Sequence, residues 1–478
     1  MSLTFFGALM LMIGPLLLMG AGMIAMLAFV MVATLFGGSA AIELPALGGS
    51  SIPPANLALL FLLLRAVLPG HRQMERLGPA LSANIFLIIF ALYGAVTAWI
   101  LPRLFAGALE VTPLRPGAVR QLFEASPVHF SSQNITTSVY LIGTLCAGIG
   151  ATLGAARPGS APILVRTGTG IAVAHALFGF LSILVAGTAL DVVIEFFRNG
   201  HYAQLDQSIE GLSRMNGIWP EASGFAAFGG AWLIFMTELW LRDVNARWTG
   251  FAATLLGFAL LISTSSTAYV TLSGYGAVLV LRALFMPGSI PFRKALILVG
   301  AAFVSAMIIL MAVTTDSAAL EKFSRIITVM TVEKTESQSG VQRLYWARQG
   351  FDAFAASAGL GIGAGTFRSS SLLTAILGSM GIIGTACFIA HLFRAFMPFR
   401  SSTHLPVSTY RAAVGAAASW TSALMLMPAA VASPSPDPGV VWATFTGIAL
   451  GLRSISEPAG GRARAPALRD PAARLAIS

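Results

Sequence analysis

Three stretches of this sequence place arginine beside turn-forming or aromatic residues, and their chemistry suits phosphate. They are "SRMNGIWPEASGFAAF" with Arg214 and Glu221, "GVQRLYWARQGFDAFAAS" with Arg343 and Arg348, and "GLGIGAGTFRSSS" with Arg368 and Ser370. The planar guanidinium group donates two parallel, charge-assisted hydrogen bonds to phosphate oxygens. Arg343 and Arg348 are therefore either a clamp for a phosphate-bearing lipid or ordinary arginines whose stems lie along apolar surface.

Arg214 and Glu221 flank a Gly-Ile-Trp-Pro turn that runs into an apolar segment. Gly217 and Pro220 are expected to bend the chain back into the membrane. Charged side chains at that depth are costly unless they are paired or functional. Arg214 and Glu221 therefore either pair with each other or belong to a site.

The glycine-rich stretch 359–371 has the composition of a loop that binds nucleotide phosphates. It lacks the lysine of a Walker loop, and no strand is expected before it, so we predict that it binds no nucleotide. Glycine permits positive φ and close approach of backbones. We predict a conformational hinge that presents Arg368, between an amphipathic helix at 340–357 and a membrane-spanning helix.

The composition indicates the class of protein that carries these stretches. Of 478 residues, 56% are hydrophobic and 10% are charged, and the mean hydropathy is +0.80. A soluble domain carries about 25% charged residues. Apolar runs near 20 residues recur along the chain, and in lipid such runs must be helices because each backbone polar group has to bond within its own segment. The sequence predicts an all-α, polytopic membrane protein.

The apolar runs predict about twelve membrane-spanning helices within a single membrane domain, residues 1–453. We place them near 5–36, 54–69, 80–101, 138–156, 163–189, 223–241, 248–264, 267–285, 294–314, 371–393, 410–432 and 439–453. The first run is long enough to be two helices, with a break near Gly20 and Gly22. A long outer loop, 315–370, precedes the tenth span, and the tail 454–478 has the composition of a disordered segment.

The distribution of charge predicts the orientation. Alternate loops and the tail hold 18 of the 29 Lys and Arg residues and only 5 of the 19 Asp and Glu residues, a balance of +13 against −3 on the other side. The positive-inside rule places the basic side in the cytoplasm, with both termini if the first run is one helix. The net charge of +10 then reflects topology and anionic membrane lipid rather than nucleic acid.

A fourth element is the hydroxyl-rich break "STSSTAYVTLSGYG", 263–276, whose side chains are expected to satisfy helix ends. Together with "RMNGIWPEASGFA", "SGVQRLYWARQGFDAF", "GLGIGAGTF" and "LLTAILGSMGIIG", it makes residues 205–395 resemble the O-antigen ligase and O-antigen polymerase (Wzy-like) superfamily of bacterial polysaccharide-assembly proteins. The order of these motifs, with a long outer loop before a late span, carries the likeness.

The resemblance implies a membrane glycosyltransferase. Its members transfer glycans from an undecaprenyl-pyrophosphate carrier to a sugar hydroxyl on the periplasmic side of the bacterial inner membrane, for surface or exopolysaccharide assembly. Arg214 and Arg343 match family arginines that hold the pyrophosphate, and Arg348, Arg368 and Ser370 would extend substrate binding. The implied partners are the lipid-linked glycan, a polysaccharide or glycolipid acceptor, membrane lipids and other polysaccharide-assembly proteins.

Two departures from the family pattern bear on the chemistry. Ser266 stands where members often carry an arginine, and Ser370 stands where ligases tend to carry a histidine. Serine does not take up a proton near neutral pH as imidazole does, so a polymerase-like or exopolysaccharide-type member is favoured over a lipid A-core ligase. By elimination, Glu221 is the candidate that orients or deprotonates the acceptor.

No cofactor is expected, because no set of His, Asp and Glu has metal-ligand spacing on the outer face. His175, in the middle of a predicted span, is read as a packed polar residue. Two other classes of function stay open: a membrane transporter or flippase, and a non-catalytic partner of a polysaccharide export complex.

Overall fold

The computed structural model describes residues 1–44, 50–68, 73–114, 124–200, 208–209, 212–315, 338–396 and 409–453. In this part of the chain, seven helices are long and apolar enough to cross a membrane, and five further apolar helices are shorter. The protein is therefore all-α and multi-pass, as predicted, while the count of about twelve spans stays a prediction. The tail 454–478 and residues 316–337 of the long loop before α15 lie outside the described residues.

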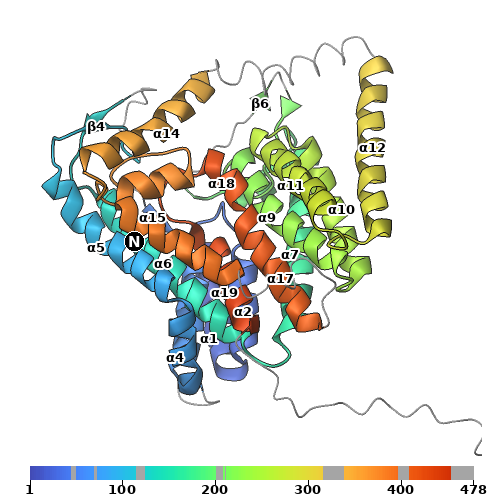
Figure 1. Cartoon of the computed structure of the whole chain (residues 1–478), viewed down its shortest axis with the longest axis horizontal. Coiled ribbons are helices and arrows are strands. Elements are labelled where there is room, and N and C mark those ends of the chain that lie inside the picture. Colours follow the sequence, from blue (N-terminus) through green and yellow to red (C-terminus); the bar gives the residue numbers. More distant parts are fainter. Residues whose placement is uncertain are drawn as a thin grey trace, which may run out of the picture.

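The helices follow the predicted apolar runs closely (Figure 1). Those of membrane length are α5 (Ile85–Leu104), α6 (Ser132–Ala155), α7 (Ser160–Leu184), α9 (Ala222–Leu241), α11 (Ser266–Phe285), α15 (Leu372–Phe396) and the pair α17 (Tyr410–Leu424) and α18 (Leu426–Ala432). The shorter apolar helices are α1 (Phe5–Gly20), α2 (Met23–Ala33), α3 (Pro54–Val67), α10 (Ala246–Ile262) and α19 (Gly439–Arg453). The remaining ones are α4 (Gln73–Ala83), α8 (Asp191–Phe196), α12 (Phe292–Thr315) and α14 (Gln338–Ala356), and α14 is the predicted amphipathic helix.

Three small antiparallel sheets join the loops. They are β1 (Ser2–Leu3), β2 (Ile42–Leu44) and β3 (Ser50–Ile52); β4 (Glu110–Val111) and β5 (Ser126–Pro127); and β6 (Ser208–Ile209) and β7 (Leu212–Ser213).

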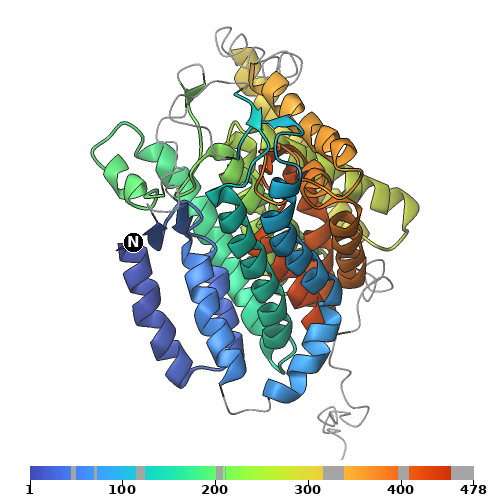
Figure 2. The same cartoon turned by 90° about the vertical axis from the view of Figure 1, so that its left-hand side faces the viewer.

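The first apolar run is two helices, which settles the alternative left open by the sequence. α1 ends at Gly20 and α2 begins at Met23. β1 and β2 pair antiparallel, with Ser2 opposite Glu43, so the two helices return to the end of the bundle from which they start. Figure 2 shows this hairpin with the N-terminus beside the strands.

Arginines gather at the other end of the bundle, which we call the basic end. The Arg65 side chain donates to the Ala21 carbonyl at 3.1 Å, Arg76 donates to Ala156 at 3.0 Å, and Arg411 donates to Leu452 at 2.9 Å. The N-terminus and Arg453 therefore lie at opposite ends. The extra turn at Gly20–Gly22 gives this arrangement, which is the one expected if the first apolar run is two helices rather than one. Which end faces the cytoplasm stays a prediction.

The C-terminal helices are interrupted inside the bundle. The Trp442 indole donates to the Ser422 carbonyl at 3.1 Å, so the start of α19 is level with the end of α17. Just before α19, Asp437 accepts a hydrogen bond from Thr144, near the middle of α6. The link 433–438 therefore lies deep within the bundle. Irregular backbone at such depth is tolerated only where protein buries it or where it lines a water-filled cavity.

Candidate functional site

The three residues predicted to be catalytic come together at the end of the bundle opposite the basic end. Arg214 precedes α9, Glu221 is the N-cap residue of α9, and Arg343 lies on α14. Burial lowers the pKa of the Arg214 guanidinium, Glu221 raises this pKa, Arg343 lowers it and Tyr269 raises it, so these three groups lie close enough to act on Arg214. We call these four residues the arginine cluster.

The arginine cluster retains positive charge. No described carboxylate forms an ion pair with Arg214 or Arg343, and Nε of Arg214 is buried without a hydrogen-bond partner. The sequence left open that Arg214 and Glu221 simply pair with each other, but Glu221 instead accepts a hydrogen bond from Ser223 at 2.5 Å. Two neighbouring guanidinium groups with unused donors form an arrangement that attracts an anion.

Arg198 fixes the turn that carries Arg214. Its Nε donates to the Gly217 carbonyl at 3.0 Å, and its Nη2 donates to the same oxygen at 2.6 Å and to Asn216 Oδ1 at 2.7 Å. The Ser182 hydroxyl accepts from the Gly217 amide at 3.1 Å. Gly217 has φ of 54°, a value that favours glycine. Arg198 is buried, and it was not among the residues that the sequence singled out.

The hydroxyl-rich break only partly behaves as predicted. Ser263 donates to the Leu260 carbonyl at 2.8 Å and so satisfies the end of α10. Ser265 is the N-cap residue of α11 but makes no capping hydrogen bond. The hydroxyls of Thr264, Ser265 and Thr267 are buried without a partner, and Thr264 has φ of 49°. Unpaired polar groups and a strained residue are typical of binding sites, and Tyr269 of the arginine cluster is two positions further along α11.

Arg343 is held by the segment that follows the glycine-rich stretch. The Ser370 hydroxyl donates to the Arg343 carbonyl at 2.6 Å, and Arg343 Nη1 donates to the Val431 carbonyl at 3.3 Å. The Ser369 amide donates to the Pro434 carbonyl at 3.0 Å. Ser370 therefore positions Arg343 through its backbone, and the neighbouring Ser369 binds the link 433–438.

The glycine-rich stretch is packed against a kink in α15. Gly381 has φ of 59° and ψ of −152°, which interrupts that helix. The Gly378 carbonyl accepts from the Ile362 amide at 2.9 Å, and the Ile382 amide donates to Gly359 at 3.0 Å. Backbone groups that the kink leaves without helical partners are thereby satisfied. The stretch 359–371, which was predicted to be a hinge, therefore holds α14 and α15 together through backbone hydrogen bonds. We call it the backbone clamp.

The other two predicted binding arginines lie differently. Arg368 stacks on the Trp346 ring, with its Cζ 4.5 Å from the ring centroid, and its amide donates to Thr112 at 2.8 Å. Arg348 lies on the exposed side of α14. Neither is among the charges that act on Arg214. The structure therefore gathers Arg214, Glu221, Arg343 and Ser370, and leaves Arg348 and Arg368 outside that group.

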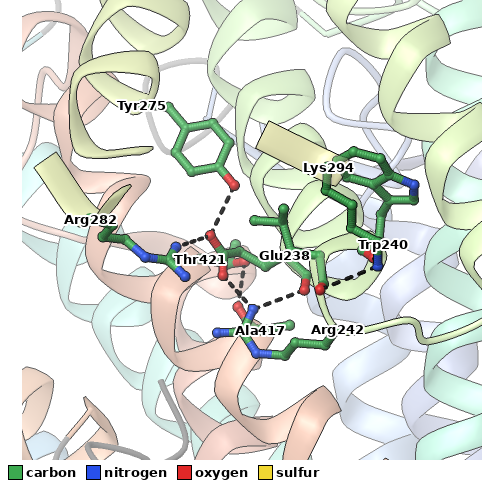
Figure 3. A network of polar contacts seen from close by, with 9 residues as sticks. Glu238, Trp240, Arg242, Tyr275, Arg282, Lys294, Ala417 and Thr421 are labelled. Carbon is green, nitrogen blue, oxygen red and sulfur yellow. Dashed lines mark hydrogen bonds and ion pairs between the residues drawn. The ribbon is translucent and has the colours of Figure 1, made fainter. Parts of the chain in front are cut away.

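A second polar network lies near the basic end (Figure 3). Glu238 of α9 is fully buried and accepts hydrogen bonds from Arg282 at 2.6 Å, from Tyr275 at 2.9 Å and from Arg242. Arg282 also stacks on Trp420, with its Cζ 4.4 Å from the ring centroid. Figure 3 shows the two arginines approaching the carboxylate from different sides. The network joins α9, α11 and α17 and is structural in character.

Other sequence predictions concern metals and histidine. The described residues contain no group of three or more His, Cys, Asp and Glu that could hold a metal ion. His175 is buried, its Nε2 lies 3.0 Å from the Phe225 carbonyl, and its ring stacks on Phe225 with centroids 4.2 Å apart. His175 is therefore the packed residue that the sequence indicated.

Sequence reasoning missed Asp437. It lies in "SPSPDPG", where three prolines break the chain between α18 and α19. Repeated proline within an apolar region is a signal of a discontinuous helix. This pattern was the feature of the sequence that could have pointed to Asp437.

No protein-family model and no curated protein sequence matches this chain. The resemblance to O-antigen ligases and polymerases stays an expectation that rests on the sequence motifs.

Proposed function

We propose that the protein transfers or polymerises glycans from an undecaprenyl-pyrophosphate-linked donor to a sugar hydroxyl, on the side of the membrane where the arginine cluster lies. The observation that carries this proposal is the convergence of Arg214 and Arg343, from segments far apart in the sequence, beside Glu221. A pair of neighbouring guanidinium groups fits a pyrophosphate, which carries several negative oxygens.

In the proposed reaction the bond between the anomeric carbon and the pyrophosphate oxygen breaks, and its electron pair leaves with the pyrophosphate. The acceptor oxygen forms the new bond to that carbon and loses its proton. Arg214 and Arg343 stabilise the negative charge that grows on the leaving group. Glu221 orients the acceptor hydroxyl, because a carboxylate oxygen accepts a hydrogen bond from a hydroxyl group.

Uncharged groups near the arginine cluster also support the proposed glycan transfer. The unpaired hydroxyls of Thr264, Ser265 and Thr267 offer donors and acceptors of the kind that sugars bind. Ser370 holds Arg343 through its backbone carbonyl, and Arg198 holds the turn at Asn216 and Gly217 that follows Arg214. Rigid support of this kind is what orientation of two reactants requires.

The test is product formation by the protein reconstituted in lipid with its polyprenyl-pyrophosphate-linked glycan. Wild type is compared with Arg214→Lys, Arg343→Lys and Glu221→Gln at equal expression, with Arg247→Lys, an exposed residue at the basic end, as the control. Losing one charge-assisted contact costs about 1.5–3 kcal/mol, or roughly tenfold to over a hundredfold in rate. Wild-type rates in all three variants would sink the proposal.

A transporter or flippase is the second candidate, and one observation favours it. Asp437 lies beside the middle of α6, in the link between α18 and α19, and broken helices that carry acids within the membrane are typical of ion-coupled transporters. The two candidates differ in outcome: a transporter moves an intact lipid-linked glycan across proteoliposomes, and a transferase yields free polyprenyl pyrophosphate.

A further inference from the structure

Asp437 makes hydrogen bonds through one of its two carboxylate oxygens. The Thr144 hydroxyl donates to Oδ1 at 2.6 Å, and the Gly439 amide donates to the same atom at 3.2 Å. No described residue forms a hydrogen bond with Oδ2. Since Thr144 lies near the middle of α6, the carboxyl group lies far from either end of the bundle.

The link that carries Asp437 is accessible despite its depth. Ser433, Ser435 and Asp437 are half-buried, and Pro434 is exposed. The Ser369 amide holds the Pro434 carbonyl, and Arg343 holds the Val431 carbonyl, so the link runs from the arginine cluster down to Asp437. Exposed irregular backbone at this depth is compatible with the membrane where it lines a water-filled cavity.

The two deep acids of the bundle have opposite surroundings. Glu238 is neutralised by Arg242 and Arg282. Asp437 faces Thr144 on α6 and the first amide of α19, and no described Lys, Arg or His forms an ion pair with it. A carboxyl group removed from bulk water without a cation binds a proton more readily than one in water.

We propose that Asp437 is a proton-binding site, reached along the link 433–438 from the arginine cluster, and that it receives the proton that the acceptor hydroxyl releases. The second part rests on the proposed function. In that step the acceptor O–H bond breaks, its electron pair forms the new bond to the anomeric carbon, and an O–H bond forms on Asp437.

Proton binding is tested without any substrate. Infrared difference spectra are recorded on the protein in lipid nanodiscs as the pH is changed, for wild type, Asp437→Asn and the control Asp352→Asn on the exposed side of α14. We expect a protonated-carboxyl band that titrates in wild type and in the control and is missing from Asp437→Asn. A band that persists unchanged in Asp437→Asn overturns the proposal.

The role in the reaction is tested by the dependence of the rate on pH. The active form is the carboxylate, so the rate falls as the pH drops through the pKa of Asp437. We call this fall in rate at low pH the acid limb. Thr144→Val removes a hydrogen bond that favours the carboxylate, so it should move the acid limb to higher pH. Asp437→Asn should lower the rate at least about tenfold and abolish the limb, whereas Asp352→Asn should leave both unchanged.

The outcomes separate the two proposals. A wild-type rate and pH profile in Asp437→Asn would overturn the proton-acceptor role while product formation still supports the transferase. A titrating band in a protein that forms no product would uphold the proton site and count against the transferase. An unshifted limb in Thr144→Val, with a folded protein, would contradict the assignment of the limb to Asp437.

Discussion

The Ser370 hydroxyl donates a hydrogen bond of 2.6 Å to the carbonyl oxygen of Arg343, across the glycine-rich stretch. Ser370 stands where the resembling ligases tend to carry a histidine. In this chain the side chain at that position supports the backbone of an arginine, and its hydroxyl is committed to that bond. The serine is therefore a positioning residue.

Ser370→Ala should weaken donor binding without removing a charge. The change leaves the Arg343 carbonyl without this donor, and a lost hydrogen bond costs about 0.5–1.5 kcal/mol. We expect a higher KM for the lipid-linked donor with a smaller change in kcat, measured on reconstituted protein. Thr254→Val, which removes an exposed hydroxyl on α10 that donates to the Gly250 carbonyl, is the control. An unchanged KM would show that Ser370 does not position Arg343.

Arg198→Lys should disturb the arginine cluster by loosening the turn that follows Arg214. A lysine cannot reproduce the three hydrogen bonds that Arg198 makes to Asn216 and Gly217, because it lacks the planar fork. We expect a loss of about 1–3 kcal/mol in stability and weaker donor binding. Thermal unfolding and donor titration measure these two effects. Wild-type values for both would contradict the role of Arg198.

Gly363→Val should destabilise the backbone clamp. Gly363 has φ of 97°, and an added Cβ would lie 2.6 Å from the Pro102 side chain and 3.1 Å from the Thr97 carbonyl. The left-handed conformation alone costs a residue with a side chain about 1–2 kcal/mol. We expect a lower melting temperature and reduced product formation.

The matched control for Gly363→Val is Gly170→Val, at an exposed helical position of α7 with open space around its Cβ. If both variants melt at the same temperature, the clamp contributes nothing specific. Nucleotide binding by the purified protein would contradict the interpretation of the stretch more directly.

Glu238→Gln should be far more damaging than Asp243→Asn. Glu238 is fully buried between two arginines, whereas the Asp243 side chain, paired with Lys294, is 74% exposed. Removing one partner of a buried pair leaves charge uncompensated and costs about 3–5 kcal/mol. An exposed pair contributes about 0.2–1 kcal/mol. Thermal unfolding of the two variants in the same lipid checks the ranking, and similar shifts would refute it.

The topology can be mapped with single cysteines after Cys146 and Cys387 are replaced by alanine. An impermeant thiol reagent added outside cells should label Ser2→Cys and leave Thr409→Cys unlabelled, because these residues lie at opposite ends of the bundle and the basic end is expected in the cytoplasm. Labelling of both positions, or only of position 409, would overturn this orientation.

The sequence by itself determined the class of fold, because apolar runs in lipid have to form helices whose backbone groups bond internally. It also located most helices and singled out Arg214, Glu221 and Arg343. Local patterns sufficed here, since hydropathy and charge are properties of single segments.

The tertiary structure decided what depends on contacts between distant segments. It separated α1 from α2, brought Arg343 to Arg214, turned the predicted hinge into a clamp on the Gly381 kink, and placed Asp437 against Thr144. The depth of Asp437 follows from the packing of α19 along α6, and the strength of an acid follows from the charges and dipoles around it. Those surroundings come from helices that are hundreds of residues away in the sequence. The local pattern "SPSPDPG" therefore could not predict them.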